Sequence, residues 1–172
     1  MPFTLENGDL QDFRELFRPG NIWSSIREDP EAMRFWHVLR EVPGEAWIQH
    51  GTGCVAVITV AHDRIESVEL LQGERAEAML RRYGFRVSDE QRRRGRKFLR
   101  PGRQITEAME EGWPHGFGIE PLSQRGGGDG AELFRYRLSW GGVLEVKADK
   151  NGKIRSHRWY EGGEALDLID GK

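Results

Sequence analysis

Apolar side chains along the first 71 residues of this 172-residue chain change from a helical to an extended spacing. Leu10, Phe13 and Phe17 share one helical face, which predicts a short amphipathic helix that ends at Pro19-Gly20. The helix-start signal Asp29-Pro30-Glu31 precedes apolar residues three and four apart, from Ala32 to Leu39, and predicts a second helix. Three strands are expected next, in residues 46–50, 54–60 and 65–71.

The same two spacings return in the rest of the chain. Helices are predicted after Gly73, after the capping box Ser88-Asp89-Glu90-Gln91, and around Ile105. Asn151-Gly152 is a strong hairpin signal between two alternating segments. A meander of three strands is therefore expected in residues 133–140, 143–148 and 154–160, with a last short helix around Ala165–Ile169.

Two parts of the chain resemble each other. Residues 53–80 align with residues 142–169 at a constant spacing of 89, and Leu16–Gly20 resembles Phe98–Gly102 at a spacing of 82. A loop insertion around Gln124–Gly130 accounts for the difference, and the pattern predicts a duplicated α–β–β–β–α unit. The similarity has a second interpretation, because glycine in turns and β-branched residues in strands recur for physical reasons in unrelated hairpins.

These elements predict an α+β fold, with antiparallel sheet or sheets and helices on one side. The length fits a single domain, residues 1–172. Within it we expect a half-unit in residues 1–84, a charged connector in 85–103 and a second half-unit in 104–172.

Composition narrows the class of protein. Cys54 is the only cysteine, which excludes an internal disulfide and a multi-cysteine metal site and fits a reducing cytoplasm. No stretch approaches the roughly 20 apolar residues that span a bilayer, and the N-terminus has no secretory signal pattern. We therefore expect a cytoplasmic protein without a membrane segment.

Positive charge is concentrated in one segment, although the net charge of the chain is −2. Residues 81–103 contain ten basic side chains and two acidic ones. A segment of this kind favours phosphate or nucleic-acid binding, although charge runs also serve as solvated connectors. The residues that would carry this alternative function are Arg92, Arg93, Arg94, Arg96, Lys97, Arg100 and Arg103.

Catalytic and metal motifs are absent from the sequence. The five histidines are scattered, and no HExxH or CxxC pattern occurs, so we expect no metal, no cofactor and no catalytic residues. Cys54 and His50 are close enough in sequence to pair across a hairpin, but a cysteine in an apolar strand is usually a small core residue. A third alternative is a small-molecule enzyme or ligand-binding domain, with His50 or His157 in a pocket between sheet and helices.

Aromatic residues near the C-terminus provide the leading hypothesis. The chain contains six tryptophans, and exposed aromatics beside arginine are typical of the core of a protein interface. We therefore expect a non-enzymatic protein-binding module, such as an adaptor, a chaperone-like protein or a toxin-neutralising protein. An exposed β edge would also allow a homodimer. The predicted interface residues on the aromatic sheet are Tyr136, Trp140, Arg158, Trp159 and Tyr160.

Overall fold

The computed structural model describes residues 1–115, 120–126 and 129–171 and divides the chain into two compact units. Unit 1 is Met1–Tyr83 and unit 2 is Gly84–Lys172. Unit 1 contains 9 basic and 14 acidic residues, whereas unit 2 contains 17 basic and 14 acidic residues, so the two units have opposite net charges. Within the described residues, no helix has the length and apolar character needed to cross a membrane.

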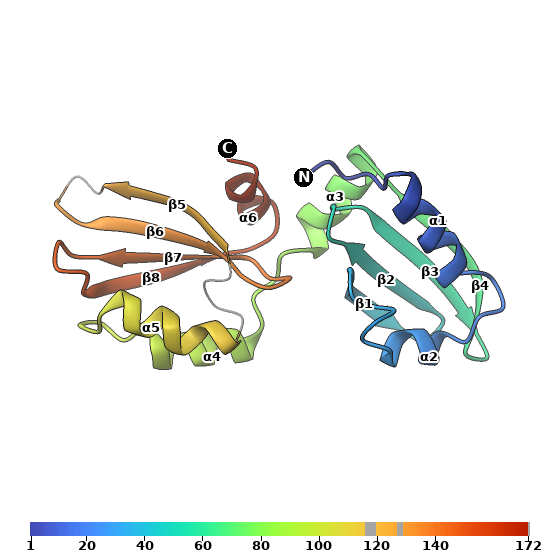
Figure 1. Ribbon diagram of the computed structural model, residues 1–172, viewed down its shortest axis with the longest axis horizontal. Helices are drawn as coiled ribbons and strands as arrows, with labels where there is room; N and C mark the ends of the chain where they lie inside the picture. The colour runs from blue at the N-terminus through green and yellow to red at the C-terminus, as the bar shows by residue number, and fades with distance from the viewer. Residues whose placement is uncertain (116–119, 127–128, 172) are drawn as a thin grey trace. The chain divides into compact units, whose positions relative to one another are not determined.

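Unit 1 consists of a pair of helices, a four-stranded antiparallel sheet and a third helix (Figure 1). The strands lie side by side in the order β1-β2-β3-β4, as a simple meander. The elements are α1 (Asn7–Leu16), α2 (Trp23–Glu28), β1 (Trp36–Val42), β2 (Glu45–His50), β3 (Val55–Ala61), β4 (Arg64–Leu71) and α3 (Glu74–Tyr83).

Unit 2 repeats this order of elements with one added 3-10 turn, and its strands also form an antiparallel meander, β5-β6-β7-β8 (Figure 1). The elements are α4 (Asp89–Phe98), α5 (Ile105–Gly112), η1 (Trp113–His115), β5 (Glu120–Gly126), β6 (Glu132–Arg137), β7 (Val143–Ala148), β8 (Ile154–Tyr160) and α6 (Gly162–Ile169). The predicted α+β class with antiparallel sheets and helices packed against them is confirmed, and the same order of elements in both units agrees with a repeat.

Each unit has its own hydrophobic core between one face of its sheet and its first two helices. In unit 1, Ile48 and Ile58 are fully buried and pack with Phe13 and Phe17 of the α1 region. In unit 2 the equivalent layer includes Leu144, Val146, Phe98 and Leu99. Because side chains alternate along a strand, the residues between these core positions lie on the opposite face, which we call the outer face of each sheet.

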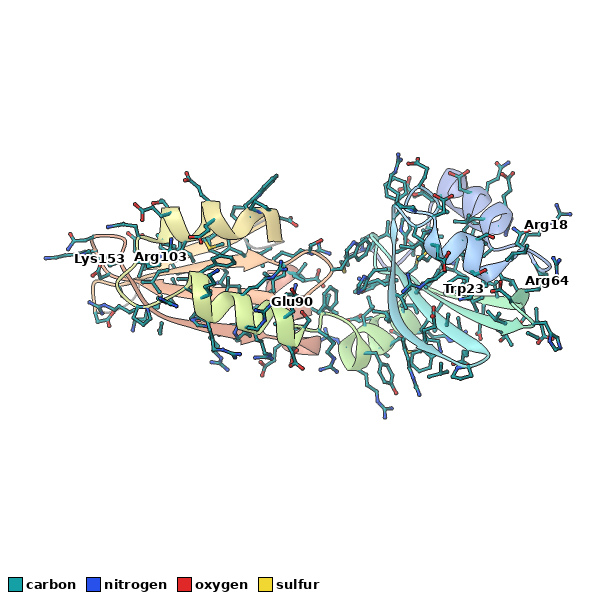
Figure 2. All side chains as sticks on the ribbon, turned by 90° about the horizontal axis from the view of Figure 1, so that it is seen from below. Arg18, Trp23, Arg64, Glu90, Arg103 and Lys153 are labelled. Atoms are coloured by element: carbon teal, nitrogen blue, oxygen red, sulfur yellow. The ribbon has the colours of Figure 1, made fainter. Side chains whose placement is uncertain are left out.

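The repeat extends to individual hydrogen bonds. In both units the loop between the first two helices bonds to the hairpin between the last two strands, and Figure 2 shows Trp23 near Arg64 and Arg103 near Lys153 at these places. Gly20 N donates to Ile65 O at 2.8 Å, and Gly102 N donates to Ile154 O at 2.7 Å. Trp23 N donates to Asp63 O at 2.8 Å, and Ile105 N donates to Gly152 O at 2.9 Å. Before the first helix of each unit, Leu5 N donates to Gln72 Oε1 at 3.0 Å and Val87 N donates to Glu161 Oε1 at 2.7 Å.

The gapless alignment at a spacing of 89 is wrong in one strand. Val60 pairs with Ile65 across the β3–β4 turn, whereas Ala148 pairs with Ile154 across the β7–β8 turn, which is one residue longer. The strands before the turn therefore correspond at a spacing of 88, and those after it at 89. A one-residue slip moves every side chain to the other face, so the gapless alignment placed core residues of β3 against outer-face residues of β7.

Each half contains one helix and one strand more than the predicted α–β–β–β–α unit. The predicted helix from Ala32 to Leu39 is wrong, because Trp36–Val42 forms strand β1 and pairs with β2. Asp29 does not N-cap a following helix but is the C-cap residue of α2, and its Oδ1 accepts from Glu31 N at 2.9 Å in a turn. Pairing with β2 and burial of the Trp36 ring outweigh the helical spacing of this short segment.

The predicted loop insertion at Gln124–Gly130 is wrong over its first part. Strand β5 extends through Gly126 and pairs with β6 from Glu120 opposite Arg137 to Gly126 opposite Glu132. Gly127 and Gly128 lie outside the described residues. The polar sequence of β5 hides its strand character, because an edge strand needs only one row of backbone bonds.

Candidate functional site

The five predicted interface residues do not share one surface. Tyr136 and Trp159 lie in one cross-strand row with Leu144 and pack against the core beneath α4 and α5. Burial raises the pKa of the Tyr136 phenol. Trp140 lies in the β6–β7 turn with a positive φ of 51°. Only Arg158 and Tyr160 are brought together on the outer face of unit 2.

The outer face of unit 2 carries a connected polar and aromatic cluster. Arg135 Nε donates to Glu145 Oε2 at 2.7 Å, and both side chains are largely buried, with exposed fractions of 16% and 13%. The Tyr160 hydroxyl lies 3.3 Å from Glu145 Oε1, and the Arg158 guanidinium lies 4.6 Å from the Tyr160 ring centre. Glu145 therefore holds Arg135 and Tyr160 in place, while Arg158 is the exposed member.

The outer face of unit 1 carries a similar cluster, which sequence reasoning missed. The Arg40 guanidinium lies 4.9 Å from the Trp47 ring centre, and the Trp47 and Tyr83 rings meet edge to face at 4.9 Å. Arg82 lies 5.1 Å from the Tyr83 ring. The predicted helix from Ala32 to Leu39 concealed strand β1, so the pairing of Arg40 with Trp47 could not be predicted.

Residues 92–98 of the Arg-rich segment (Arg92–Arg103) lie in helix α4. The predicted capping box is present, with Ser88 Oγ accepting from Gln91 N at 3.0 Å, and Phe98 and Leu99 at the other end are buried in the core of unit 2. Four of its seven basic residues pair with carboxylates. These pairs are Arg92 with Glu161 (3.3 Å), Arg93 with Glu90 (3.6 Å), Arg94 with Glu90 (2.7 Å; Glu90 is labelled in Figure 2) and Arg103 with Glu111 (2.7 Å).

The other basic side chains of the segment have no carboxylate partner in the described part of the chain. Arg96, Lys97 and Arg100 line a hollow of about 520 Å³ with Arg93, Arg94 and Phe98, which we call the basic hollow. Of the seven predicted phosphate-binding residues, the structure thus brings five together around one cavity. Arg92 and Arg103 do not line it.

Cys54 is a buried core residue. Burial raises the pKa of its thiol to about 11, although a hydrogen bond from the Thr52 hydroxyl, 3.7 Å from the sulfur, acts in the opposite direction. His50 Nδ1 faces Thr52, at 2.9 Å from its hydroxyl oxygen and 3.2 Å from its backbone nitrogen, rather than the thiol. A thiol held protonated and away from a base does not act as a nucleophile.

His50 also lines a groove of about 530 Å³ between α1, α2 and the segment before β1. Its apolar lining includes the buried rings of Phe13 and Trp36 and the half-exposed ring of Phe35. Four carboxylates and one guanidinium complete it, from Asp9, Asp12, Glu15, Glu31 and Arg34. We call this site the acidic groove.

His37 and His157 lie in different units of the chain. His157 contacts the Trp159 ring edge to face at 5.6 Å, and burial lowers its pKa, with a further lowering from Arg96. Burial, then Arg27, lowers the pKa of His37. Among the residues with described positions, no three His, Cys, Asp or Glu side chains are grouped as metal ligands would be.

A comparison with protein-family models, curated proteins and solved structures found no match. Function must therefore be argued from the contacts, burial and charge of the residues themselves. The two outer faces, the basic hollow and the acidic groove carry the contacts and charges that bear on function.

Proposed function

We propose that this protein is a non-enzymatic protein-binding module that engages its partner through the outer faces of its sheets. The observation that carries the proposal is the recurrence of arginine stacked on an aromatic ring on both outer faces, Arg40 on Trp47 and Arg158 on Tyr160. Arginine, tyrosine and tryptophan are the residue types that dominate binding energy at protein interfaces. Adaptors, chaperone-like proteins and toxin-neutralising proteins all work by binding of this kind.

The neighbours of these residues support a binding role because they hold the side chains in place before a partner arrives. In unit 1 the Tyr83 ring packs edge to face against the Trp47 ring, and in unit 2 Glu145 accepts a hydrogen bond from the Tyr160 hydroxyl. A side chain already held in its bound conformation loses less entropy on association, at about 0.5–1.5 kcal/mol for each one immobilised. Such ordering is more useful on a recognition surface than on one that only meets solvent.

Charge reversal at the two exposed arginines tests the proposal. Arg40→Glu and Arg158→Glu should each leave the fold intact, because both side chains are exposed, and should reduce capture of a stoichiometric protein partner from the native host. Arg18→Glu and Lys150→Glu are matched controls, since they make the same charge change at exposed positions away from the outer faces. The proposal fails if the wild type retains no protein partner, or if all four variants retain it equally.

The basic hollow supports a second candidate function, the binding of phosphate groups or nucleic acid. Three cations without carboxylate partners, Arg96, Lys97 and Arg100, surround one cavity, and such a cluster releases counterions when it neutralises phosphates. Replacing all three with alanine should weaken binding of a single-stranded oligonucleotide and lower the salt dependence by roughly 0.7 in log–log slope for each lost contact.

A control for this second candidate removes the same charge elsewhere in unit 2. Lys150, Lys153 and Arg125 are exposed and do not line the hollow, so their triple alanine variant should keep the wild-type slope. Equal slopes for wild type and the hollow variant would exclude the basic hollow as a phosphate site. Nuclease treatment of the captured material separates this function from protein binding.

A further inference from the structure

The acidic groove of unit 1 has a composition that none of the other described hollows shares. We infer that it binds the side chain of an arginine or lysine presented by a peptide segment of a partner protein. The acidic groove is separate from the outer faces, so this inference does not depend on the interface proposed above.

The first observation is that acidic residues of α1 lie on the same helical stripe as apolar residues that line the groove. Asp9, Asp12, Phe13 and Leu16 follow at i, i+3, i+4 and i+7, so two carboxylates share a helical stripe with a buried phenylalanine. Neither Asp9 nor Asp12 has a hydrogen bond or an ion pair within the described residues. Unpaired carboxylates beside an apolar wall suit a cation that has an apolar stem, as arginine and lysine do.

The second observation is a polar atom of a buried side chain that has no partner. His50 is 7% exposed and lines the groove. Nδ1 is occupied by Thr52, at 3.2 Å from its backbone nitrogen and 2.9 Å from its hydroxyl oxygen. Nε2 makes no hydrogen bond to any described residue, which leaves it available to a polar atom of a bound peptide.

The third observation is the aromatic wall. The Phe35 ring is 50% exposed, an uncommon state for a phenylalanine, and its centre lies 6.1 Å from that of His50. Arg34 already stacks on this ring at 4.3 Å, which shows that the ring accepts a guanidinium. Arg34 also pairs with Glu31 at 3.4 Å, so the groove retains an excess of negative charge after this pair is formed.

The equivalent helix of unit 2 shows that acidity is not a requirement of the fold. At the spacing of 82 that relates α1 to α4, Asp12 corresponds to Arg94 and Glu15 to Lys97. The same structural positions therefore carry carboxylates in one unit and cations in the other. A groove volume of about 530 Å³ accommodates a basic side chain together with part of the adjoining peptide.

The test uses the full-length chain and two short peptides, acetyl-Gly-Arg-Gly-amide and its neutral near-isostere acetyl-Gly-citrulline-Gly-amide. In ¹H–¹⁵N NMR titrations, the arginine peptide should produce saturable shifts at Phe35, at the Trp36 indole and at the Nε2 resonance of His50. The citrulline peptide should bind at least about threefold more weakly, since it lacks the charge.

The variant Asp9→Asn with Asp12→Asn should weaken the arginine peptide by roughly three- to tenfold, because two charge contacts are lost. Glu66→Asn is the matched control, an exposed carboxylate on β4 outside the groove, and should bind as the wild type does. Equal shifts for both peptides, shifts centred on Trp47 and Tyr83 instead, or no saturation at about 20 mM peptide would each overturn the inference. The comparison of peptides on the wild type remains decisive if the double variant does not fold.

Discussion

Gly142 lies where two backbone carbonyls converge, and its replacement by alanine gives the sharpest stability prediction. A Cβ at this position would lie 2.0 Å from Tyr160 O and 3.0 Å from Phe85 O. The normal contact distance is 3.4–4 Å, so the Tyr160 carbonyl would have to move by more than 1 Å. The obstruction is backbone on both sides, which no change of rotamer relieves.

The free-energy cost of Gly142→Ala follows from the hydrogen bonds that the two neighbouring backbone segments make. Phe85 O accepts the Gly162 N–H at the start of α6, and Tyr160 pairs with Val143 at the end of β8. Overpacking costs about 1–3 kcal/mol, and a lost hydrogen bond about 0.5–1.5 kcal/mol. Gly142→Ala should therefore lower the free energy of unfolding of unit 2 by about 1.5–4.5 kcal/mol.

The assay is thermal unfolding of the full chain followed by NMR signals assigned to unit 2. A loss of this size lowers the midpoint for a domain of 60–100 residues by at least about 6 °C. Gly126→Ala is the control, because its Cβ would meet nothing within 4 Å, and it should change stability by less than about 0.5 kcal/mol. A loss below about 1 kcal/mol for Gly142→Ala would refute the reasoning.

Three further predictions rest on buried polar groups. Gln49→Met should raise stability by about 1–2 kcal/mol in urea denaturation, because Gln49 Oε1 is buried and has no hydrogen-bond partner among the described residues; a loss would contradict this. Cys54, whose thiol pKa is raised to about 11, should react with Ellman's reagent at pH 8 at least tenfold more slowly in the native protein than in 6 M guanidinium chloride, and equal rates would disprove its burial. Burial lowers the pKa of His37, His50 and His157 below 6.5. The stability that their neutral forms contribute is present above pH 6.5 and is lost as the pH falls through the folded pKa values. The melting temperature should therefore fall between pH 7.5 and 5, and His50→Gln should make this fall smaller.

Local signals predicted the elements that are specified locally. The capping box at Ser88 begins α4, and the Asn151-Gly152 turn lies between β7 and β8, as the sequence indicated. Strand β1 was missed because its apolar spacing also fits a helix. Its pairing with β2 is a long-range interaction, which a short window of sequence does not contain.

The site was harder to predict because its members meet only through strand pairing. Arg40 joins Trp47 across two strands, and its position was assigned to no strand. In the predicted interface, the residue alternation of β8 separates Trp159 from Arg158 and Tyr160 onto opposite faces. The alternation of side chains along a strand, which the sequence alone provides, predicts that Trp159 lies on a different face from Arg158 and Tyr160.

The repetition of one helix-and-sheet unit within a single chain bears on the partner binding proposed above. Two similar units with opposite net charges are joined in one chain, so the second contact of a partner that engages both becomes intramolecular. Its strength is then set by an effective concentration, which reaches the millimolar range for short connections, and avidity exceeds either single affinity by about 10²–10⁴. If a partner engages both units through the outer faces as proposed, two individually weak surfaces are sufficient for stable association, and the separated halves would each bind it far more weakly than the whole chain.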